Sequence, residues 1–400
     1  MNEQELVKLN NELSSLTVFR PLLADGVLSA LRLYFDTVGQ PDKKRALSAY
    51  ADFVSRLYTE NAGDLTAYIE QICFNSENVY VKMLGRGDTP PKCICESVDY
   101  ELSVLGKVAS LTPNDLTDCL NFGGFVPPFD SHPDDLPEKY GYRARNIQKY
   151  GYGKYAANQM FYLDSDCNIV PVKNPDKISL SELADYEYQR RIIINNTKAL
   201  INGKPAANIL LTGDAGTGKS STVKAVANEF FCDGLRIIEV RKEQLNAIPK
   251  VLDELAQNPL KFILFIDDLS FSSDDDNFNG LKAVLEGSVS ARSNNTVVYA
   301  TSNRRHIVKE RFSDRDGDEI HRNDSMQEMI SLSNRFGIHI TFSKPDKTTY
   351  LNIVKQLANQ CSVKMDDSEL ELRAERFALE RGGRSARLAK QFIDGILSES

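Results

Sequence analysis

The sequence has no tryptophan and only seven cysteines among its 400 residues. An odd number of scattered cysteines does not suit the disulfide framework of small secreted domains, so we expect reduced thiols. Only Cys93 and Cys95 are close together, and neither a second pair nor a nearby histidine accompanies them, which favours inert thiols over a zinc site. The seven are Cys73, Cys93, Cys95, Cys119, Cys167, Cys232 and Cys361.

Long apolar runs are also missing. No stretch approaches the ~18 apolar residues of a membrane span, and the N-terminus, MNEQELVKLNNELSS, is acidic and polar where a secretory signal is basic and then apolar. The formal net charge of -8 argues against a basic coat for bulk binding to nucleic acid or anionic lipid, although it leaves room for local patches. These absences predict a soluble, cytoplasmic protein that does not bind membranes.

What is present is an ordinary globular composition, 42% hydrophobic and 26% charged, in a chain long enough for two or three domains of about 150 residues. From about Leu180 onward, short apolar runs alternate with segments of helical spacing. Such nearly continuous runs are typical of a parallel sheet that is covered on both faces, so we predict an α/β core with five parallel strands between helices. The runs are NILLTG (208–213), LRIIEV (235–240), FILFID (262–267), TVVYAT (296–301) and IHITF (338–342).

The pattern on either side of this core is helical. After Phe342 three helical stretches follow, and the first about 175 residues carry mostly helical signals. Leucines near the start (Leu6, Leu9, Leu13 and Leu16) fit either a core stripe, which we favour, or a partner-binding face. We therefore expect three domains: a mainly helical N-terminal domain (1–178), the α/β core (179–343) and a small helical domain (344–400).

One loop carries a specific signal. The first core strand leads into GDAGTGKS, the G-x-x-x-x-G-K-S pattern of a phosphate-binding P-loop, and a predicted helix follows. Glycines let backbone N–H groups surround phosphate oxygens, and the helix N-terminus adds the positive end of its dipole. Lys219 would reach the β and γ phosphates of ATP, and the Ser220 hydroxyl would bind Mg²⁺. The cofactor-binding residues would be Gly213, Asp214, Ala215, Gly216, Thr217, Gly218, Lys219, Ser220 and Ser221.

Polar residues follow two further strands. Asp267 ends a buried strand, where a carboxylate is costly unless it is needed, and it would help to hold Mg²⁺ together with Ser220. Asp268 would orient and polarise the attacking water. Asn303, just past the next strand, would sense the γ phosphate, although an asparagine there could also simply form a turn.

The order of these motifs, followed by SLSNRFG and a helical tail, resembles the AAA+ ATPases. The resemblance implies that Arg335 acts as an arginine finger on the ATP of a neighbouring subunit. It also implies that Arg384, or failing that Arg387, is the second sensor in a helical lid. Most active AAA+ enzymes have Glu where this chain has Asp268, one methylene shorter, so we expect slow turnover.

Residues 125–395 are similar to a prokaryotic AAA+ family catalogued as domain of unknown function 815, through LADYEYQRR, FIDDLSF, LKAVLEGS and YATSNRRHI. The resemblance implies an AAA+ fold and a bound nucleotide, and it identifies no substrate. Our leading hypothesis is an ATP hydrolase that assembles with copies of itself, a hexamer being one candidate, to remodel or load an unknown partner, either a protein or a single-stranded nucleic acid. The alternative is a nucleotide-gated DNA-binding or adaptor module in which hydrolysis is incidental. The position of residues 185–189 resembles that of the segment that borders the adenine, although a plain helix start fits these residues equally well.

Tyrosines and basic residues alternate over residues 139–155, KYGYRARNIQKYGYGKY. Aromatic rings beside cations are what single-strand binding needs. A tyrosine-rich segment packed on the core explains the pattern equally well, and we favour it because the neighbouring DSHPDDLPE is acidic.

Overall fold

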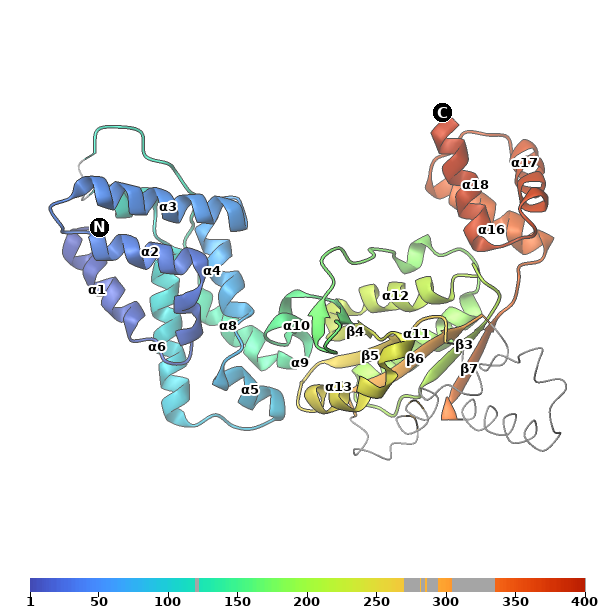
Figure 1. Ribbon diagram of the computed structural model, residues 1–400, viewed down its shortest axis with the longest axis horizontal. Helices are drawn as coiled ribbons and strands as arrows, with labels where there is room; N and C mark the ends of the chain where they lie inside the picture. The colour runs from blue at the N-terminus through green and yellow to red at the C-terminus, as the bar shows by residue number, and fades with distance from the viewer. Residues whose placement is uncertain (119–121, 270–280, 282–284, 286–293, 304–334, 400) are drawn as a thin grey trace. The chain divides into compact units, whose positions relative to one another are not determined.

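The computed structural model describes residues 1–118, 122–269, 281, 285, 294–303 and 335–399 (Figure 1). The chain divides into two compact units, Met1–Ala157 and Asn158–Ser400. This boundary lies before residue 178, where the sequence places the end of the N-terminal domain. The difference arises because residues 160–171 form two strands that belong to the sheet of the second unit.

The N-terminal unit is built from helices. Its first five α-helices each begin at an asparagine or aspartate whose side chain accepts a hydrogen bond from a first-turn N–H group, which satisfies a donor that the helix itself leaves open. No helix in the described part of the chain is long and apolar enough to cross a membrane. The helices are α1 (Glu3–Ser14), α2 (Gly26–Thr37), α3 (Lys43–Asn61), α4 (Leu65–Phe74), α5 (Val79–Arg86), α6 (Lys92–Ala109), α7 (Pro113–Thr117), α8 (Leu136–Arg145), α9 (Ile147–Tyr150) and α10 (Lys154–Ala157).

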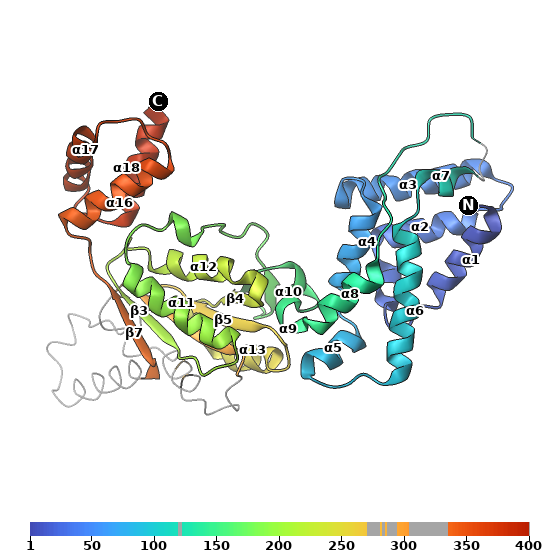
Figure 2. The ribbon, with the colours of Figure 1, turned by 180° about the vertical axis from the view of Figure 1, so that it is seen from behind.

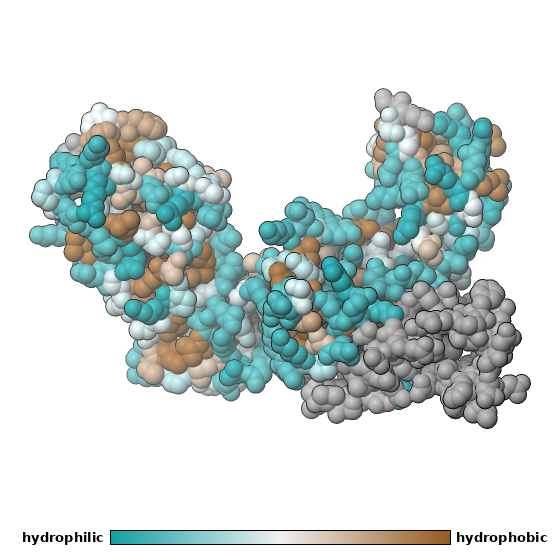
Figure 3. Space-filling view, in the orientation of Figure 1, coloured by the Kyte–Doolittle hydropathy of each residue, from teal (hydrophilic) through white to brown (hydrophobic). Residues whose placement is uncertain are grey.

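This unit has a core of its own. The N-terminal leucines Leu6, Leu9, Leu13 and Leu16 are all buried in it, so they are core residues and not an exposed docking stripe. The outer surface mixes hydrophilic and hydrophobic side chains over the face seen in Figure 3. Two cysteines of interest in the sequence, Cys93 and Cys95, lie on α6 with free thiols. No group of three His, Cys, Asp or Glu side chains that could hold a metal occurs among the described residues.

A buried carboxylate joins α6 to the loop after α1. Glu101 is 2% exposed, and its oxygens accept hydrogen bonds from the N–H groups of Thr17, Val18 and Phe19 at 2.8, 3.1 and 2.8 Å. The Thr17 hydroxyl donates a fourth at 2.6 Å. A charged group is tolerated in a core only when it is fully hydrogen-bonded, as it is here, so Glu101 fixes the loop that precedes α2.

The tyrosine-rich segment is largely part of this packing. Tyr140 and Tyr155 are buried at 4% and 6% exposure. The guanidinium of Arg143 lies between two rings, 4.5 Å from that of Phe74 and 4.4 Å from that of Tyr150. These contacts agree with the packing interpretation for part of the segment, whereas Tyr142 is 54% exposed and Arg145 and Lys149 are exposed as well.

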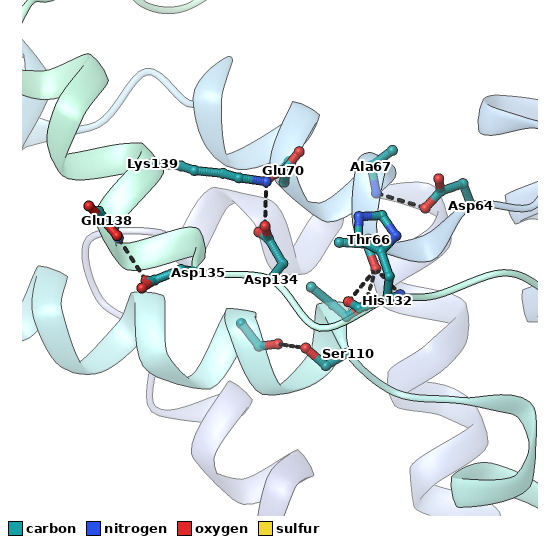
Figure 4. A network of polar contacts seen from close by, with 12 residues as sticks. Asp64, Thr66, Ala67, Glu70, Ser110, His132, Asp134, Asp135, Glu138 and Lys139 are labelled. Carbon is teal, nitrogen blue, oxygen red and sulfur yellow. Dashed lines mark hydrogen bonds and ion pairs between the residues drawn. The ribbon is translucent and has the colours of Figure 1, made fainter.

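Lys139, at the start of the same segment, forms ion pairs with Glu70 and Asp134, within a network of polar contacts that joins α4 and α8 (Figure 4). The two hydrogen bonds raise the pKa of Lys139 to about 12. Burial is the largest single influence on the pKa of Asp134 and raises it, but the hydrogen bonds to the carboxylate and the charge of Lys139 together leave that pKa below the ordinary value of 3.8. The charge of Lys139 is therefore paired with two carboxylates of the N-terminal unit.

The second unit is organised around a seven-stranded sheet with the order β2-β1-β4-β5-β6-β3-β7. All neighbouring strands are parallel except β1 and β2, which pair antiparallel. The five strands predicted from the sequence are confirmed, and β1 and β2 are additional. The strands are β1 (Met160–Leu163), β2 (Ile169–Pro171), β3 (Ile209–Gly213), β4 (Leu235–Glu239), β5 (Lys261–Ile266), β6 (Thr296–Ser302) and β7 (Ile338–Phe342).

Both faces of this sheet are buried over its inner strands β3 to β6. Ile209 and Leu211 of β3 pack in one cluster with residues of α11 (Glu187–Ile201) and α12 (Lys219–Glu229), which cover one face (Figure 2). Leu210, whose side chain points to the opposite face, is buried as well. A further helix, α13 (Ile248–Leu255), lies between β4 and β5 in the chain. Burial on both sides explains why the strands are nearly continuous in apolar residues.

Three helices end the chain: α16 (Lys347–Gln360), α17 (Asp367–Glu380) and α18 (Ala386–Glu399). They enclose a small core of their own, and we call them the lid. The lid contacts the segment before α11, because Ala184 packs against its core and the side-chain amide of Gln360 donates to the Ser181 carbonyl at 2.8 Å. The lid and the segment before α11 therefore lie side by side.

Candidate functional site

The P-loop, residues 213–220, joins the end of β3 to the start of α12, as the sequence predicts. Its first glycine has no room for a side chain. Gly213 has φ +139°, and a Cβ atom there would lie 2.0 Å from the Phe342 carbonyl oxygen of the adjacent strand. The close approach of β7 therefore requires glycine at this position.

The other end of the loop is open. Gly218, with φ +89°, is the N-cap of α12, and a Cβ atom there would meet nothing within 4 Å. Among the residues that the structure describes, no side chain caps the N-terminus of α12 by a hydrogen bond. The first-turn N–H groups and the positive end of the helix dipole are thus left for an anion, which is the arrangement that binds phosphate.

Lys219, the first residue of α12, is 5% exposed. Its Nζ donates to the carbonyl oxygens of Gly213 at 2.9 Å and Asp214 at 2.8 Å, and to Asn303 Oδ1 at 3.0 Å. Burial lowers the pKa of Lys219, the carboxylates of Asp267, Asp214 and Asp268 raise it, and Arg387 lowers it further. A buried cation close to a second cation favours a ligand of high negative charge.

The two residues predicted to hold a metal are in contact. The Ser220 hydroxyl donates to Asp267 Oδ1 at 2.6 Å, across the gap between α12 and the end of β5. A hydroxyl and a carboxylate are oxygen donors, and Mg²⁺ takes few protein ligands and keeps several waters. The donor set therefore fits Mg²⁺ bound together with a phosphate.

Asp268 and Asn303 also meet. The Asn303 side-chain amide donates to Asp268 Oδ1 at 2.7 Å, while its oxygen accepts from Lys219. Asp268 adopts a left-handed backbone conformation with φ +53°, which non-glycine residues adopt at some energetic cost and which recurs at functional sites. One amide thus connects the cation of the P-loop to the candidate water-orienting carboxylate.

The loop faces a cavity of about 780 Å³, a size that suits a small-molecule ligand. Residues 215–221 line it, whereas Gly213 and Asp214 contribute through the carbonyls that hold Lys219. The remaining walls come from Thr222, from the segment around the start of α11, from the strand ends and from the lid. They are Thr222, Ile178, Glu182, Leu183, Ala184, Asp185, Tyr186, Arg190, Asp267, Asp268, Thr301, Asn303, Ile353, Leu357, Gln360, Cys361, Ala386, Arg387, Lys390, Ile393 and Asp394.

The segment expected to border the base reaches the cavity at its first two residues. Asp185 and Tyr186 line it and both have left-handed backbones, with φ +58° and +59°. The Tyr186 hydroxyl donates to the Ser343 carbonyl at 2.6 Å, and burial raises its pKa to about 12. Gln189 points elsewhere, since its amide donates to the Thr341 carbonyl at 3.3 Å.

The three candidate arginines have different surroundings. Arg384 forms two 2.8 Å hydrogen bonds with Glu375 of the lid and does not line the cavity. Arg387 does line it, and its N–H donates to the Gly216 carbonyl at 3.1 Å. Arg335 lies just before β7, is partly exposed, and is outside the cavity of its own chain. The geometry therefore favours Arg387 over Arg384 as the lid residue that meets a ligand.

Thr301 belongs to the site although no sequence motif marks it. This residue is 2% exposed in β6, and its hydroxyl contacts both Asp267 and the backbone of Asp268. Only its position two residues before Asn303 could have drawn attention to it.

The family model described as "Protein of unknown function (DUF815)" matches residues 156–400. No curated protein matches. A mutant of RuvB from Thermotoga maritima is 16% identical with a TM-score of 0.37, and the match covers 54% of this chain and 63% of that one. The Thermotoga maritima RuvB Holliday junction branch migration motor is 14% identical with a TM-score of 0.34, covering 54% and 71%. At such identities the likeness concerns the fold alone.

Proposed function

The chain belongs to the family described as "Protein of unknown function (DUF815)", and we propose that it binds ATP with Mg²⁺ at the P-loop and hydrolyses it. The observation that carries this proposal is the meeting of Lys219, Ser220 and Asp267 at the uncapped N-terminus of α12. A nearly buried cation, a helix N-terminus and a hydroxyl–carboxylate pair together suit a polyphosphate with its metal.

The residues of the loop would bind the phosphates. The backbone N–H groups at the start of α12 would donate to phosphate oxygens, and Lys219 would exchange its bond to Asn303 for one to the β and γ phosphates. Ser220 and Asp267 would hold Mg²⁺, which supplies positive charge against the charge that develops on the transferred phosphate. The Asn303 amide nitrogen has two N–H groups, and the one that does not bind Asp268 would donate to the γ phosphate.

Asp268 would orient the attacking water. Its carboxylate already has one defined partner, the Asn303 amide, so its direction is set before any ligand arrives. Water would attack the γ phosphorus in line with the leaving oxygen, and Asp268 would accept a hydrogen bond from that water.

Arg335 would act on a neighbouring subunit. It does not line the cavity of its own chain, which is consistent with a guanidinium that completes the site of the next copy in a homo-oligomer. Hydrolysis at such an interface would drive the remodelling or loading of a protein or a single-stranded nucleic acid.

Nucleotide binding is tested with Lys219→Ala and a matched control, Lys224→Ala. Lys224 lies on the same helix, one and a half turns further on, and does not line the cavity. Titration calorimetry should show tight ATP binding for the parent and for Lys224→Ala, and none for Lys219→Ala. Equal affinity in all three proteins would refute the proposal.

A second candidate is a nucleotide-gated adaptor or DNA-binding module in which hydrolysis is incidental. The short side chain of Asp268, held by Asn303, favours it, because a carboxylate with less reach polarises water less well. Steady-state ATPase rates with and without single-stranded DNA separate the two. Turnover well above background supports the enzyme, whereas ATP binding with negligible turnover supports the module.

A further inference from the structure

Thr301 lies beneath both carboxylates of the site. Its hydroxyl donates to Asp267 Oδ1 at 2.5 Å and accepts a hydrogen bond from the N–H of Asp268 at 2.9 Å. Thr301 is 2% exposed and comes from β6, the strand next to β5, which carries the two aspartates. A single rigidly placed hydroxyl therefore contacts the metal-binding candidate and the water-orienting candidate at once.

The two oxygens of the Asp267 carboxylate have different surroundings. Oδ1 accepts from Thr301, from the Ser220 hydroxyl at 2.6 Å and from the Asp268 N–H at 3.2 Å. Oδ2 receives no hydrogen bond from the residues that the structure describes. A carboxylate with one saturated oxygen presents the other to a hydrated cation, so the donor from Thr301 defines which oxygen faces the metal.

The same residue supports the turn that follows β5. Asp268 has φ +53°, a conformation that an aspartate adopts with some strain unless its surroundings hold it. The Thr301 hydroxyl holds the N–H of Asp268, and the Thr301 carbonyl accepts from the N–H of Leu269 at 2.7 Å. The turn is thus attached to Thr301 on both sides of its strained residue.

We propose that Thr301 is a positioning residue: its hydroxyl orients Asp267 toward Mg²⁺ and fixes the turn that directs Asp268. This inference rests on the proposed ATP and Mg²⁺ binding. Removal of an outer hydrogen bond to a metal-binding carboxylate weakens metal affinity by about 10 to 100-fold in general. The effect should therefore appear in the Mg²⁺-dependent part of ATP binding and not in the contacts of the P-loop.

The test compares Thr301→Val, which keeps the shape and removes the hydroxyl, with Thr301→Ser, which keeps the hydroxyl. The matched control is Thr212→Val, because Thr212 is a buried threonine of the neighbouring strand β3. Among the residues that the structure describes, its hydroxyl is hydrogen-bonded only to that of Thr341, at 3.3 Å. ATP affinity is measured by calorimetry in EDTA and across a Mg²⁺ titration, with thermal unfolding of each variant alongside.

We expect Thr301→Val to need about 10 to 100-fold more Mg²⁺ for the same gain in ATP affinity, with its affinity in EDTA unchanged. Thr301→Ser should restore most of the loss, and Thr212→Val should behave as the parent. Thr301→Ala, which also lacks the hydroxyl and adds no atoms, must show the same loss and replaces Thr301→Val if that variant does not fold.

Three outcomes would overturn the inference: a Mg²⁺ dependence unchanged in Thr301→Val and Thr301→Ala, an equal loss of affinity in EDTA, or the same loss in Thr212→Val. Failure of the proposed function looks different, because the parent protein itself would then not bind ATP.

Discussion

Arg387→Ala should weaken ATP binding strongly, whereas Arg384→Ala should leave the affinity nearly unchanged. The two arginines lie close together in the sequence GGRSAR, and this motif alone does not show which of them meets a nucleotide. Arg384 forms a double hydrogen bond with Glu375 inside the lid. Arg387 lines the cavity, and it is near enough to Lys219 to lower the pKa of that lysine.

The size of the effect follows from these contacts. A hydrogen bond between charged groups contributes about 1.5 to 3 kcal/mol, which corresponds to about 10 to 150-fold in Kd. Loss of the Arg387 guanidinium should fall in this range, since it would remove a cation that faces the phosphates. Loss of Arg384 should instead lower the melting temperature of the lid, because Glu375 keeps only its longer contact with Lys347, at 3.7 Å.

Calorimetric titration with ATP and Mg²⁺ gives the affinities, and thermal unfolding of the same samples reports folding. The reasoning is refuted if Arg384→Ala weakens binding as much as Arg387→Ala while its melting temperature stays that of the parent. In that case Arg384 would leave Glu375 when nucleotide binds, and the original assignment from the sequence would hold.

Three further predictions concern other parts of the chain. Glu101→Ala should destabilise the protein by about 3 kcal/mol or more in urea unfolding, since it leaves the buried N–H groups of residues 17–19 without an acceptor, and a difference below about 1 kcal/mol contradicts this. Lys139→Met should lower the melting temperature at neutral pH. Because the pKa of Asp134 is lowered in the folded state, the ion pair stabilises the protein above pH 3.8, and this stabilisation is lost as the pH falls through the folded pKa. The difference in melting temperature between Lys139→Met and the parent should therefore vanish in acid. A difference that stays constant with pH would argue against the ion pair. Mixing Lys219→Ala with Arg335→Ala subunits should restore ATPase activity as protein concentration rises, and inactive mixed assemblies would exclude a finger acting between subunits.

The parts of the fold that depend on local pattern were predictable. Four of the five predicted strands, β3 to β6, lie inside the sheet and are almost wholly buried, so each is a nearly continuous apolar run that the chain displays on its own. The fifth, β7, is at the edge of the sheet, and its His339 and Thr341 are exposed. The strands β1 and β2 are four and three residues long, and Tyr162 of β1 is exposed. Such short, half-exposed strands exist only through pairing with β4 and with each other, which no local pattern reveals.

The candidate site also has parts that the sequence reveals and parts that only the folded chain reveals. The P-loop is recognisable because its glycines, Lys219 and Ser220 all lie within the short stretch 213–220. The geometry of phosphate binding requires their spacing there. Thr301 and Tyr186 act through partners 34 and 157 positions away, so only the folded chain reveals their roles. The tyrosines at 140 and 155 were ambiguous for another reason: a ring that could stack on a base is equally suited to a core.

The contact between the lid and the P-loop has a consequence for how a ligand would be sensed. Arg387 donates its backbone N–H to the Gly216 carbonyl, and a Cβ atom on Gly216 would lie 3.1 Å from that of Arg387. The lid thus contacts the backbone of the loop directly. At the base of the lid, the Tyr186 hydroxyl binds the Ser343 carbonyl from within the cavity wall. A ligand that changed the loop or Tyr186 would therefore act on the lid through two main-chain contacts, which side-chain substitutions on the lid surface would not remove.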